Sequence, residues 1–260
     1  MIRIRIIPTL LLKNAGLVKG VNFENFQYIG DPINAVKIFN EKGADELVFL
    51  DISASPSRLG PNFELIQDIA SEAFMPFAYG GGITAINQIE KLFRIGVEKI
   101  IINSAAHSNP ELIRNASSIA GSQSIVVSID VRKSIFGSYE VYTKNGSFRT
   151  RENPIDYARR MEDLGAGELI VCSINQEGTG KGYDIKLIND VSRSVSIPVV
   201  ASGGAAEVRD FAQAVNVGMA SAVAAGSMFV FHGKRRGVLI TYPRYDDLEA
   251  QLKQDESDAT

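Results

Sequence analysis

The stretch GADELVFLD (residues 43–51) decides the fold, because its pattern returns later in the chain as GAGELIVCS (residues 165–173). The offset between the two is 122 residues, as from Glu46 to Glu168. A constant offset at separate places predicts two similar halves, each too small to close a sheet alone. The same offset relates Pro76 to Pro198, Gly81-Gly82 to Gly203-Gly204, and Gly96 to Gly218.

Short apolar runs and amphipathic segments alternate on both sides of this stretch. Nearly continuous apolar strands between helices are typical of a parallel sheet that is covered on its outer face. Eight such runs in 260 residues favour an α/β fold of the (β/α)8 TIM barrel type over an open sheet. The expected strands are Arg3–Leu12, Glu46–Ile52, Met75–Tyr79, Lys99–Asn103, Ser124–Asp130, Glu168–Ile174, Ile197–Ala201 and Ser221–Ala225, and the clearest helices are Pro32–Lys42, Ala85–Ile95, Pro154–Leu164 and Ile185–Ser194.

The composition excludes several classes of function. The net charge is −3, and the one basic cluster is Lys234-Arg235-Arg236, so nucleic acid is not an expected partner. No apolar run approaches the ~20 residues of a membrane span, and the single Cys172 suits a reducing cytoplasm. We expect one barrel domain over residues 1–245. The polar tail, residues 246–260, is expected to form a short helix that becomes disordered after Lys253.

Two glycine loops follow the third and seventh expected strands, at the barrel end where functional residues lie. Glycine lets backbone N–H groups approach an anion closely, so each half is expected to form one phosphate-binding loop set. We call these the first and second phosphate cups, and the alternative is that their glycines only permit tight turns. The loops hold Gly81-Gly82 and Gly203-Gly204, and the next strand of each half is followed by Asn103-Ser104 and by Gly226-Ser227.

Charged residues at the strand ends are the other candidates. Asp130 ends the fifth expected strand and is the best candidate for a general acid or base. Asp51 ends the second, where it either orients a substrate or caps a helix or braces its own loop. Lys19 lies in an expected polar loop after the first strand. Its ammonium either binds an anion or is solvated there. Cys172 is expected to be a core residue.

The starts of four strands carry charges of alternating sign. The general interpretation of such a ring is structural, with paired charges closing the bottom of the barrel. The functional interpretation is a gate. The four residues are Arg5, Glu46, Lys99 and Glu168.

Six stretches, in order and over nearly the whole chain, resemble the cyclase subunit of imidazole glycerol phosphate synthase. The resemblance implies a two-half barrel with a glutaminase subunit on its bottom face. Ammonia from that subunit passes a charged gate and the barrel interior. At the top, a substrate with two phosphate ends is cyclised and cleaved, which is a lyase reaction of histidine biosynthesis. The stretches are GDPINAVKIFNEKGADELVFLDISAS, YGGGI, INSAA, GSQSIVVSID, EGTGKGYD and VASGGA.

The resemblance assigns roles to individual residues, and it implies no cofactor and no metal. It places the gate at the four charges above and lets Glu98 face the glutaminase. Lys19, Asp51 and Glu177 belong to the substrate pocket, although the family has Asp in place of Glu177. The first phosphate cup is Gly82, Asn103 and Ser104; the second is Gly178, Gly203, Gly204, Gly226 and Ser227, where the sequence AAGSM departs from the family pattern.

One of the two catalytic aspartates of the family is Asp130, and the position of the other holds Leu11. Loss of a positioned acid–base group typically costs about 10²–10⁴-fold in rate. The cyclase reaction is therefore expected to be impaired, unless another group such as Lys13 or a bound water replaces the missing acid. Retention of the charged ring indicates that ammonia passage is still useful.

Further stretches resemble a branch of the family associated with sugars of surface polysaccharide. They are IPTLLLK, PNFELIQDIASEAFMPFAYGGGI and AVAAGSMFVFHGKRRGVLITYP. The resemblance implies ammonia delivery, with a glutaminase and a sugar amidotransferase, for conversion of an acetamido to an acetamidino group on a nucleotide-activated sugar. The alternatives are an authentic cyclase of histidine biosynthesis and a non-catalytic module that binds a phosphorylated small molecule.

Overall fold

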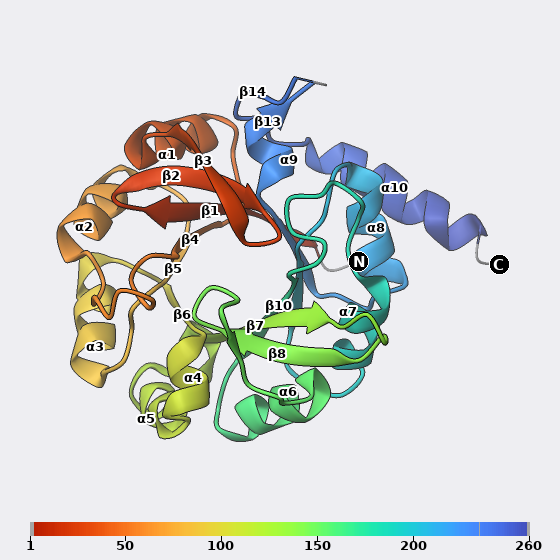
Figure 1. The fold of residues 1–260 in the computed structure, drawn as a ribbon. Coiled ribbons are helices and arrows are strands. Elements are labelled where there is room, and N and C mark those ends of the chain that lie inside the picture. Colours follow the sequence, from red (N-terminus) through yellow and green to blue (C-terminus); the bar gives the residue numbers. More distant parts are fainter. Residues whose placement is uncertain (1–2, 234, 259–260) are drawn as a thin grey trace.

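The chain forms a closed (β/α)8 TIM barrel, which confirms the predicted fold class (Figure 1). The computed structural model describes residues 3–233 and 235–258. Eight parallel strands pair in a complete circle, because β12 returns to pair with β1. The circle consists of β1 (Arg5–Lys13), β4 (Leu47–Asp51), β5 (Phe77–Gly80), β6 (Lys99–Ile102), β7 (Ile125–Lys133), β10 (Glu168–Ser173), β11 (Val199–Ser202) and β12 (Ala222–Ala225).

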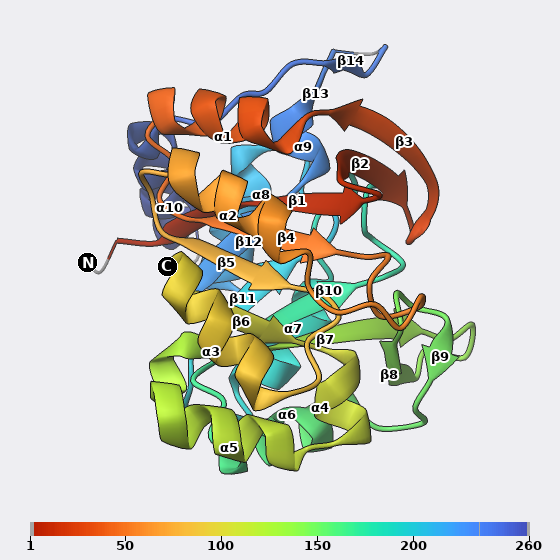
Figure 2. The same ribbon diagram turned by 90° about the vertical axis from the view of Figure 1, so that its left-hand side faces the viewer.

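Helices surround the circle of strands and cover its outer face (Figures 1 and 2). Each predicted strand and helix is present, with ends that differ by a few residues. The helices are α1 (Pro32–Glu41), α2 (Phe63–Glu72), α3 (Ile86–Ile95), α4 (Ser104–Ser108), α5 (Glu111–Ala120), α6 (Pro154–Asp163), α7 (Ile185–Ser192), α8 (Val208–Asn216), α9 (Ser227–Val230) and α10 (Tyr245–Asp258), with a 3₁₀ turn at Ser122–Ser124.

Helix starts in the two halves use the same local signal. The Asp31 carboxylate caps α1 by accepting from the backbone N–H of Asn34 at 2.9 Å. Its counterpart in the repeat, Asn153, caps α6 by accepting from the N–H of Ile155 at 2.8 Å. Each cap is followed by a proline, whose missing N–H costs nothing in the first turn.

Side chains that alternate along each strand fill the barrel interior. On β1 the inward positions run from Arg5 at the bottom through Ile7 and Thr9 to Leu11 at the top, since strand side chains have a period of two. The middle of the barrel is apolar and almost fully buried. It is filled by Ile7, Val48, Ala78, Ile101, Val126, Ile170, Val200, Ala222 and Ala224.

Antiparallel strands extend the barrel beyond its top, on the side toward which the strand arrows point in Figure 2. The polar loop expected after the first strand is instead β2 (Gly16–Val21), paired with β1 and with β3 (Glu24–Gly30). The prediction was wrong there because Leu17 and Val18 are buried and give the segment an apolar face. In the other half, β8 (Tyr139–Thr143) extends β7 and pairs with β9 (Phe148–Arg149), and β13 (Phe231–His232) pairs with β14 (Gly237–Val238).

The C-terminal helix α10 packs on the barrel. Leu248 and Leu252 are buried in the core, and α10 contacts α8. The helix continues to Asp258, past Lys253 where we expected it to end, and residues 259–260 lie outside the described range. Within the described residues, no helix has both the length and the apolar character to cross a membrane.

Candidate active site

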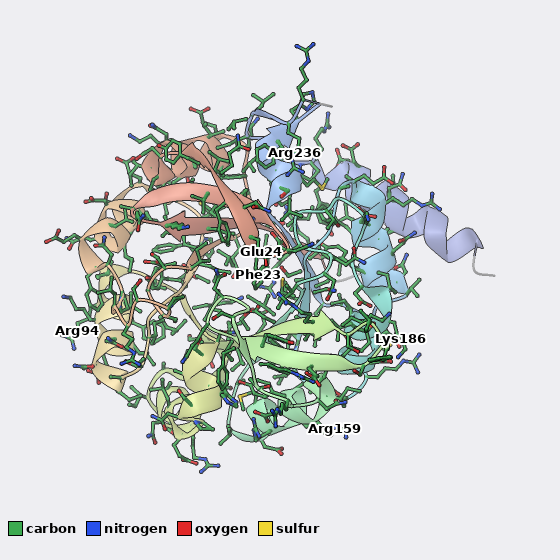
Figure 3. All side chains as sticks on the ribbon, in the orientation of Figure 1. Phe23, Glu24, Arg94, Arg159, Lys186 and Arg236 are labelled. Atoms are coloured by element: carbon green, nitrogen blue, oxygen red, sulfur yellow. The ribbon has the colours of Figure 1, made fainter. Side chains whose placement is uncertain are left out.

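A pocket at the top of the barrel brings together most of the predicted site residues. Figure 3 shows Phe23, from the turn between β2 and β3, near the centre of this barrel mouth. Phe23 is one of the residues that line the pocket. The predicted residues that line it are Leu11, Lys19, Asp51, Gly82, Asn103, Ser104, Asp130, Glu177 and Gly226. Of the residues predicted for the top of the barrel, four do not line it: Gly178, Gly203, Gly204 and Ser227.

Asp130 stands at the top of β7 and is held by two side chains. Its Oδ1 accepts a hydrogen bond from the Ser128 hydroxyl at 3.4 Å, and its Oδ2 accepts one from the Asn103 amide at 3.2 Å. The same Asn103 amide also donates to the backbone carbonyl of Ser128 at 3.0 Å. These contacts fix the carboxyl group in one orientation toward the pocket.

Burial, with a smaller contribution from the nearby Glu177 carboxylate, raises the pKa of Asp130 to about 7. The hydrogen bonds from Ser128 and Asn103 act in the opposite direction, because they stabilise the charged form. A carboxyl group with a pKa near 7 is present in both protonation states at neutral pH. Asp130 is therefore poised to donate or accept a proton.

Leu11 occupies the equivalent position in the first half. On β1 it pairs in register with Leu50, and on β7 Asp130 pairs in register with Cys172. Leu50 and Cys172 are related by the repeat offset, so Leu11 and Asp130 are counterparts. Leu11 is 8% exposed and lines the pocket. One side of the mouth thus carries an acid, and the equivalent side is apolar.

Lys19 is the buried cation of the mouth. It lies in β2, its side chain is 1% exposed, and its ammonium is 3.2 Å from Glu177 Oε1. A Cβ atom at Gly226 would stand 1.8 Å from Lys19 Nζ, so glycine at that position leaves the space that the ammonium fills. The solvated lysine that the sequence left open is therefore wrong. The buried ammonium offsets the charge of Glu177.

Asp51 is engaged in bracing its own loop. Its Oδ1 accepts from the backbone N–H groups of Ser53 and Ala54, at 2.9 and 3.1 Å, and from the Ser53 hydroxyl at 2.6 Å. This local turn corresponds to the bracing role that the sequence left open beside substrate orientation. Asp51 nevertheless lines the pocket, and these three hydrogen bonds all go to Oδ1 rather than to Oδ2.

The residues of the first phosphate cup are tied into the protein. Gly82 has a φ of +67°, and a Cβ there would stand 2.3 Å from the carbonyl oxygen of Leu59. The Ser104 hydroxyl accepts from the backbone N–H of Lys144 at 3.0 Å and donates to Asn103 Oδ1 at 3.3 Å. The positive φ and the close Leu59 carbonyl together require glycine at position 82, so phosphate binding stays a prediction.

The second phosphate cup lies beside the mouth. The loop with Gly178 packs against β2, where a Cβ at that position would be 2.2 Å from the carbonyl oxygen of Gly20. Ser227 begins α9, and its buried hydroxyl has no hydrogen-bond partner among the residues that the structure describes. Only Gly226 of this set reaches the pocket, so its role in phosphate binding also stays a prediction.

The four predicted charges form a closed ring at the bottom of the barrel. Arg5 pairs with Glu46 at 2.6 Å and with Glu168. Lys99 pairs with the same two carboxylates, at 3.2 and 2.8 Å. Both glutamate side chains are 7% exposed, so the ring closes that end of the barrel. Glu98, beside Lys99, is exposed on the same face.

Several site residues were not predicted. Ser128 donates a hydrogen bond to Asp130. The sequence indicated this neighbour, because side chains two residues apart on a strand point to the same face. Ser202, Thr9 and Asn145 also line the mouth. Cys172 lines it too, and burial raises the pKa of its thiol well above the usual value, with Glu177 and Asp130 adding to the effect.

No group of three or more His, Cys, Asp or Glu residues within the described ranges has the arrangement of a metal site. His107 forms a contact with Glu152 at 2.7 Å, and it lies outside the mouth pocket.

Comparison of the sequence with known proteins identifies relatives of this chain. Residues 5–235 match the family described as histidine biosynthesis protein. A protein of Pseudomonas aeruginosa, named "Putative imidazole glycerol phosphate synthase subunit hisF2", is 48% identical over 96% of this chain and 99% of its own. A similarly named hisF3 of Vibrio vulnificus is 46% identical over 97% and 98%. The "Imidazole glycerol phosphate synthase subunit HisF" of Petrotoga mobilis is 43% identical over 88% and 90%.

Proposed function

We propose a function from one premise: this chain belongs to the histidine biosynthesis protein family, as a HisF-like cyclase subunit of a glutamine amidotransferase complex. Its finer role, in our proposal, is to deliver ammonia for amidination of a nucleotide-activated sugar of surface polysaccharide. The observation that carries this proposal is Leu11, an apolar residue at the position equivalent to Asp130. A two-group acid–base reaction at the mouth lacks one of its groups.

The barrel interior supports a conduit for neutral ammonia. Between the charged ring and the mouth, the interior is lined by apolar side chains such as Ile7, Val48 and Ile101. Ammonium would lose its hydration there without gaining a partner, whereas uncharged ammonia pays far less. The ring of Arg5, Glu46, Lys99 and Glu168 would then act as the gate at the entrance.

The bottom face supports a glutaminase partner. Large apolar side chains are exposed in the loops that lead into the strands, with Phe74 at 87%, Val217 at 59% and Met219 at 51%. Exposed apolar groups around a polar centre are typical of a protein interface. The partner would place its ammonia source over the ring and leave the top of the barrel for an acceptor enzyme, a sugar amidotransferase.

A gene deletion tests the proposed role. In the native host, with glutamine as the only nitrogen source, deletion of the gene for this chain should abolish the acetamidino group on the surface sugar, measured by mass spectrometry. Complementation with the wild-type gene should restore it. Amidinated sugar that persists at wild-type levels after deletion would contradict the proposal.

A second candidate is an authentic imidazole glycerol phosphate synthase cyclase. It is favoured by the pKa of Asp130 at about 7, which suits that carboxyl group to proton transfer. Purified protein would be given ammonium salt at alkaline pH and the bisphosphate substrate of that family. Formation of imidazole glycerol phosphate would support this candidate, and restored growth of a histidine auxotroph would strengthen it.

A further inference from the structure

The C-terminal segment meets the bottom of the barrel beside the charged ring. Figure 2 shows α10 near the start of β1, at the end of the barrel opposite to that toward which the strand arrows point. Two tyrosines of this segment, Tyr242 and Tyr245, bond to the backbone at the start of β1. Arg5 of the ring lies in that same short stretch, so the C-terminal segment bears directly on the ring.

The Tyr242 hydroxyl stands between β1 and the segment that leads into β4. Its oxygen accepts from the backbone N–H of Asp45 at 3.2 Å. Its proton is directed to the Ile6 carbonyl at 3.0 Å, with Asp45 Oδ2 as a second acceptor at 3.2 Å. Burial raises the pKa of the Tyr242 phenol above its usual value, so the hydroxyl keeps this proton at neutral pH. The hydroxyl therefore bridges a donor and an acceptor of two neighbouring segments.

The other half of the barrel has a direct hydrogen bond at the equivalent place. Ile125 of β7 is the counterpart of Ile6 of β1, because each lies five residues before the counterpart positions of the mouth. Gly167 is the counterpart of Asp45 by the 122-residue offset. The N–H of Gly167 donates directly to the Ile125 carbonyl at 2.9 Å. In the first half, the Tyr242 hydroxyl takes the place of this direct hydrogen bond.

The strand pairing differs between the halves at the same level. Pairing of β7 with β10 begins at Glu168 itself, so that ring acid lies inside a regular ladder. Pairing of β1 with β4 begins at Val48, two residues after Glu46. The two acids make ion pairs with the same cations, and they differ in how the backbone behind them is held. For Glu46, the Tyr242 hydroxyl supplies the contact that strand pairing supplies for Glu168.

Further contacts hold the chain on both sides of Arg5. The Tyr245 hydroxyl accepts from the N–H of Ile4 at 3.1 Å. Asp45 Oδ2 accepts from the N–H of Ile6 at 3.2 Å. The Arg5 guanidinium in turn donates to the acid that follows Asp45, at 2.6 Å. The backbone on both sides of this ion pair is therefore bonded to the C-terminal segment, directly or through Asp45.

A cavity beside these contacts leaves room for movement. Its volume is about 320 Å³, and Lys42, Asp45, Tyr242 and Tyr245 are among the residues that line it. A shift of Asp45 into this space would not have to deform the apolar core. The Tyr242 ring packs against Phe229 with their centroids 5.7 Å apart, so the hydroxyl can be removed while the ring keeps its contact.

We propose that Tyr242 is a positioning residue for the charged ring: its hydroxyl holds the side formed by Arg5 and Glu46, and this side opens when the hydroxyl is displaced. The side formed by Glu168 stays in place, because regular strand pairing holds it. The positioning role is independent of the proposed function. Control of ammonia entry through the ring rests on the proposed function, so the two roles are tested separately.

Amide hydrogen exchange in Tyr242→Phe tests the positioning role. Exchange at Asp45 and Ile6 should rise by at least about tenfold, because loss of the bridging hydroxyl lets this segment open locally. Ile6 is the decisive amide, since its acceptor is the Asp45 carboxylate and only a movement of that residue would release it. Gly167 is the control within the chain, and its exchange should stay at the wild-type rate.

Tyr183→Phe is the matched control variant. The Tyr183 hydroxyl is also buried and donates to the Ala224 carbonyl at 2.9 Å, in the middle of the barrel. This variant should leave exchange at Asp45 and Ile6 unchanged. Unchanged exchange at both amides in Tyr242→Phe would overturn the proposal, because the two segments would then close without the hydroxyl. An increase at Asp45 alone would overturn it too, since only the lost acceptor would respond.

Control of ammonia entry is tested in the complex purified from the native host through a tag on this chain. Amidinated sugar formed with glutamine would be compared with that formed with ammonium salt, which can enter at the mouth. In Tyr242→Phe the ratio of the two rates should fall, and glutamate released per product should rise, because ammonia escapes at a ring that is no longer held. Tyr183→Phe should keep the wild-type ratio.

The outcomes of this second experiment separate the two proposals. Equal ratios in wild type and Tyr242→Phe would overturn control of entry by the C-terminal segment. A wild-type complex that forms no product from glutamine would contradict the proposed function, and control of entry with it. The exchange rates at Asp45 and Ile6 would still decide whether Tyr242 positions the ring.

Discussion

The two halves of the barrel place different side chains at one equivalent position of the mouth. In the second half it is Asp130, held by Ser128 and Asn103, with a pKa of about 7. In the first half it is Leu11, buried and without a titratable group. At the bottom the two acids agree, since Glu46 and Glu168 bond the same two cations, although Arg5 and Lys99 both come from the first half.

The comparison separates the residues that an ammonia entrance would need from those that proton transfer at the mouth would need. The two acids of the ring and the apolar interior follow the repeat, as the proposed passage through the barrel would require. The mouth differs between the halves at the position where a two-group proton transfer would place its second acid. This difference is what an ammonia-delivering barrel, relieved of its own ring closure, would show.

Restoring the acid should give the largest effect. If the missing group alone limits cyclisation, Leu11→Asp should raise turnover of the bisphosphate substrate with ammonium by about 10²–10⁴-fold. Production of imidazole glycerol phosphate measures it. Leu11→Asn is the control, because it is polar and similar in size to Asp but cannot transfer a proton. Equal turnover by wild type and Leu11→Asp would show that the missing acid at position 11 does not limit cyclisation.

Removing the remaining acid should change the pH dependence of stability. In the folded state Asp130 keeps its proton up to a pH of about 7, whereas in the unfolded chain it ionises near its ordinary pKa of 3.8. Between these values the folded state binds more protons, so wild-type stability falls as pH rises. Relative to wild type, Asp130→Asn should gain up to ~4 kcal/mol in free energy of unfolding across this window.

Urea unfolding at several pH values measures this gain. Leu11→Asn serves as the reference, because that position has no titratable group in wild type and should show no such trend. A constant difference between Asp130→Asn and wild type from pH 4 to 7 would show that the Asp130 carboxyl is not desolvated.

The bottom ring should respond symmetrically. Glu46→Gln and Glu168→Gln each leave Arg5 and Lys99 with one carboxylate in place of two. Each should lower the free energy of unfolding by about 2–3 kcal/mol, because a nearly buried ion pair is broken. The exposed Glu98→Gln is the control and should change it by less than about 0.5 kcal/mol. Clearly unequal effects of the two ring variants would show that the halves differ at the bottom as well.

The sequence predicted the barrel because the strand pattern and the 122-residue offset are local and repeated. It missed β2 because the turn before it, at Asn14 and Ala15, has φ values of 51° and 63° without the usual glycine. It could not pair Lys19 with Glu177, which are 158 residues apart and meet only when the barrel closes. The roles left open for Lys19 and Asp51 depended on such contacts.

The halves also differ, by a smaller amount, at position 226, where glycine leaves room for the Lys19 ammonium. Gly226→Ala would put a Cβ atom where the ammonium lies and should cost about 1–3 kcal/mol, as overpacked cores do. Adding Lys19→Met should reduce that cost, and the double-mutant cycle measures the coupling. The control is Ser227→Ala, because the Ser227 hydroxyl has no partner within residues 3–233 and 235–258 and its loss should be near neutral. Additive effects of Gly226→Ala and Lys19→Met would mean that the two do not meet.

Ser104 is the first-half counterpart of Gly226 by the same offset, and it should give the smallest effect. Its hydroxyl accepts from the Lys144 N–H, so Ser104→Ala should cost about 1 kcal/mol in thermal or urea unfolding. Ser108→Ala is the control, because its exposed hydroxyl only donates to the Ser104 carbonyl. A hydroxyl fits at position 104 because no lysine occupies its space, whereas position 226 must be glycine to admit Lys19. If Ser104→Ala is as neutral as Ser108→Ala, the turn after β8 is held by other contacts and the halves differ there only in sequence.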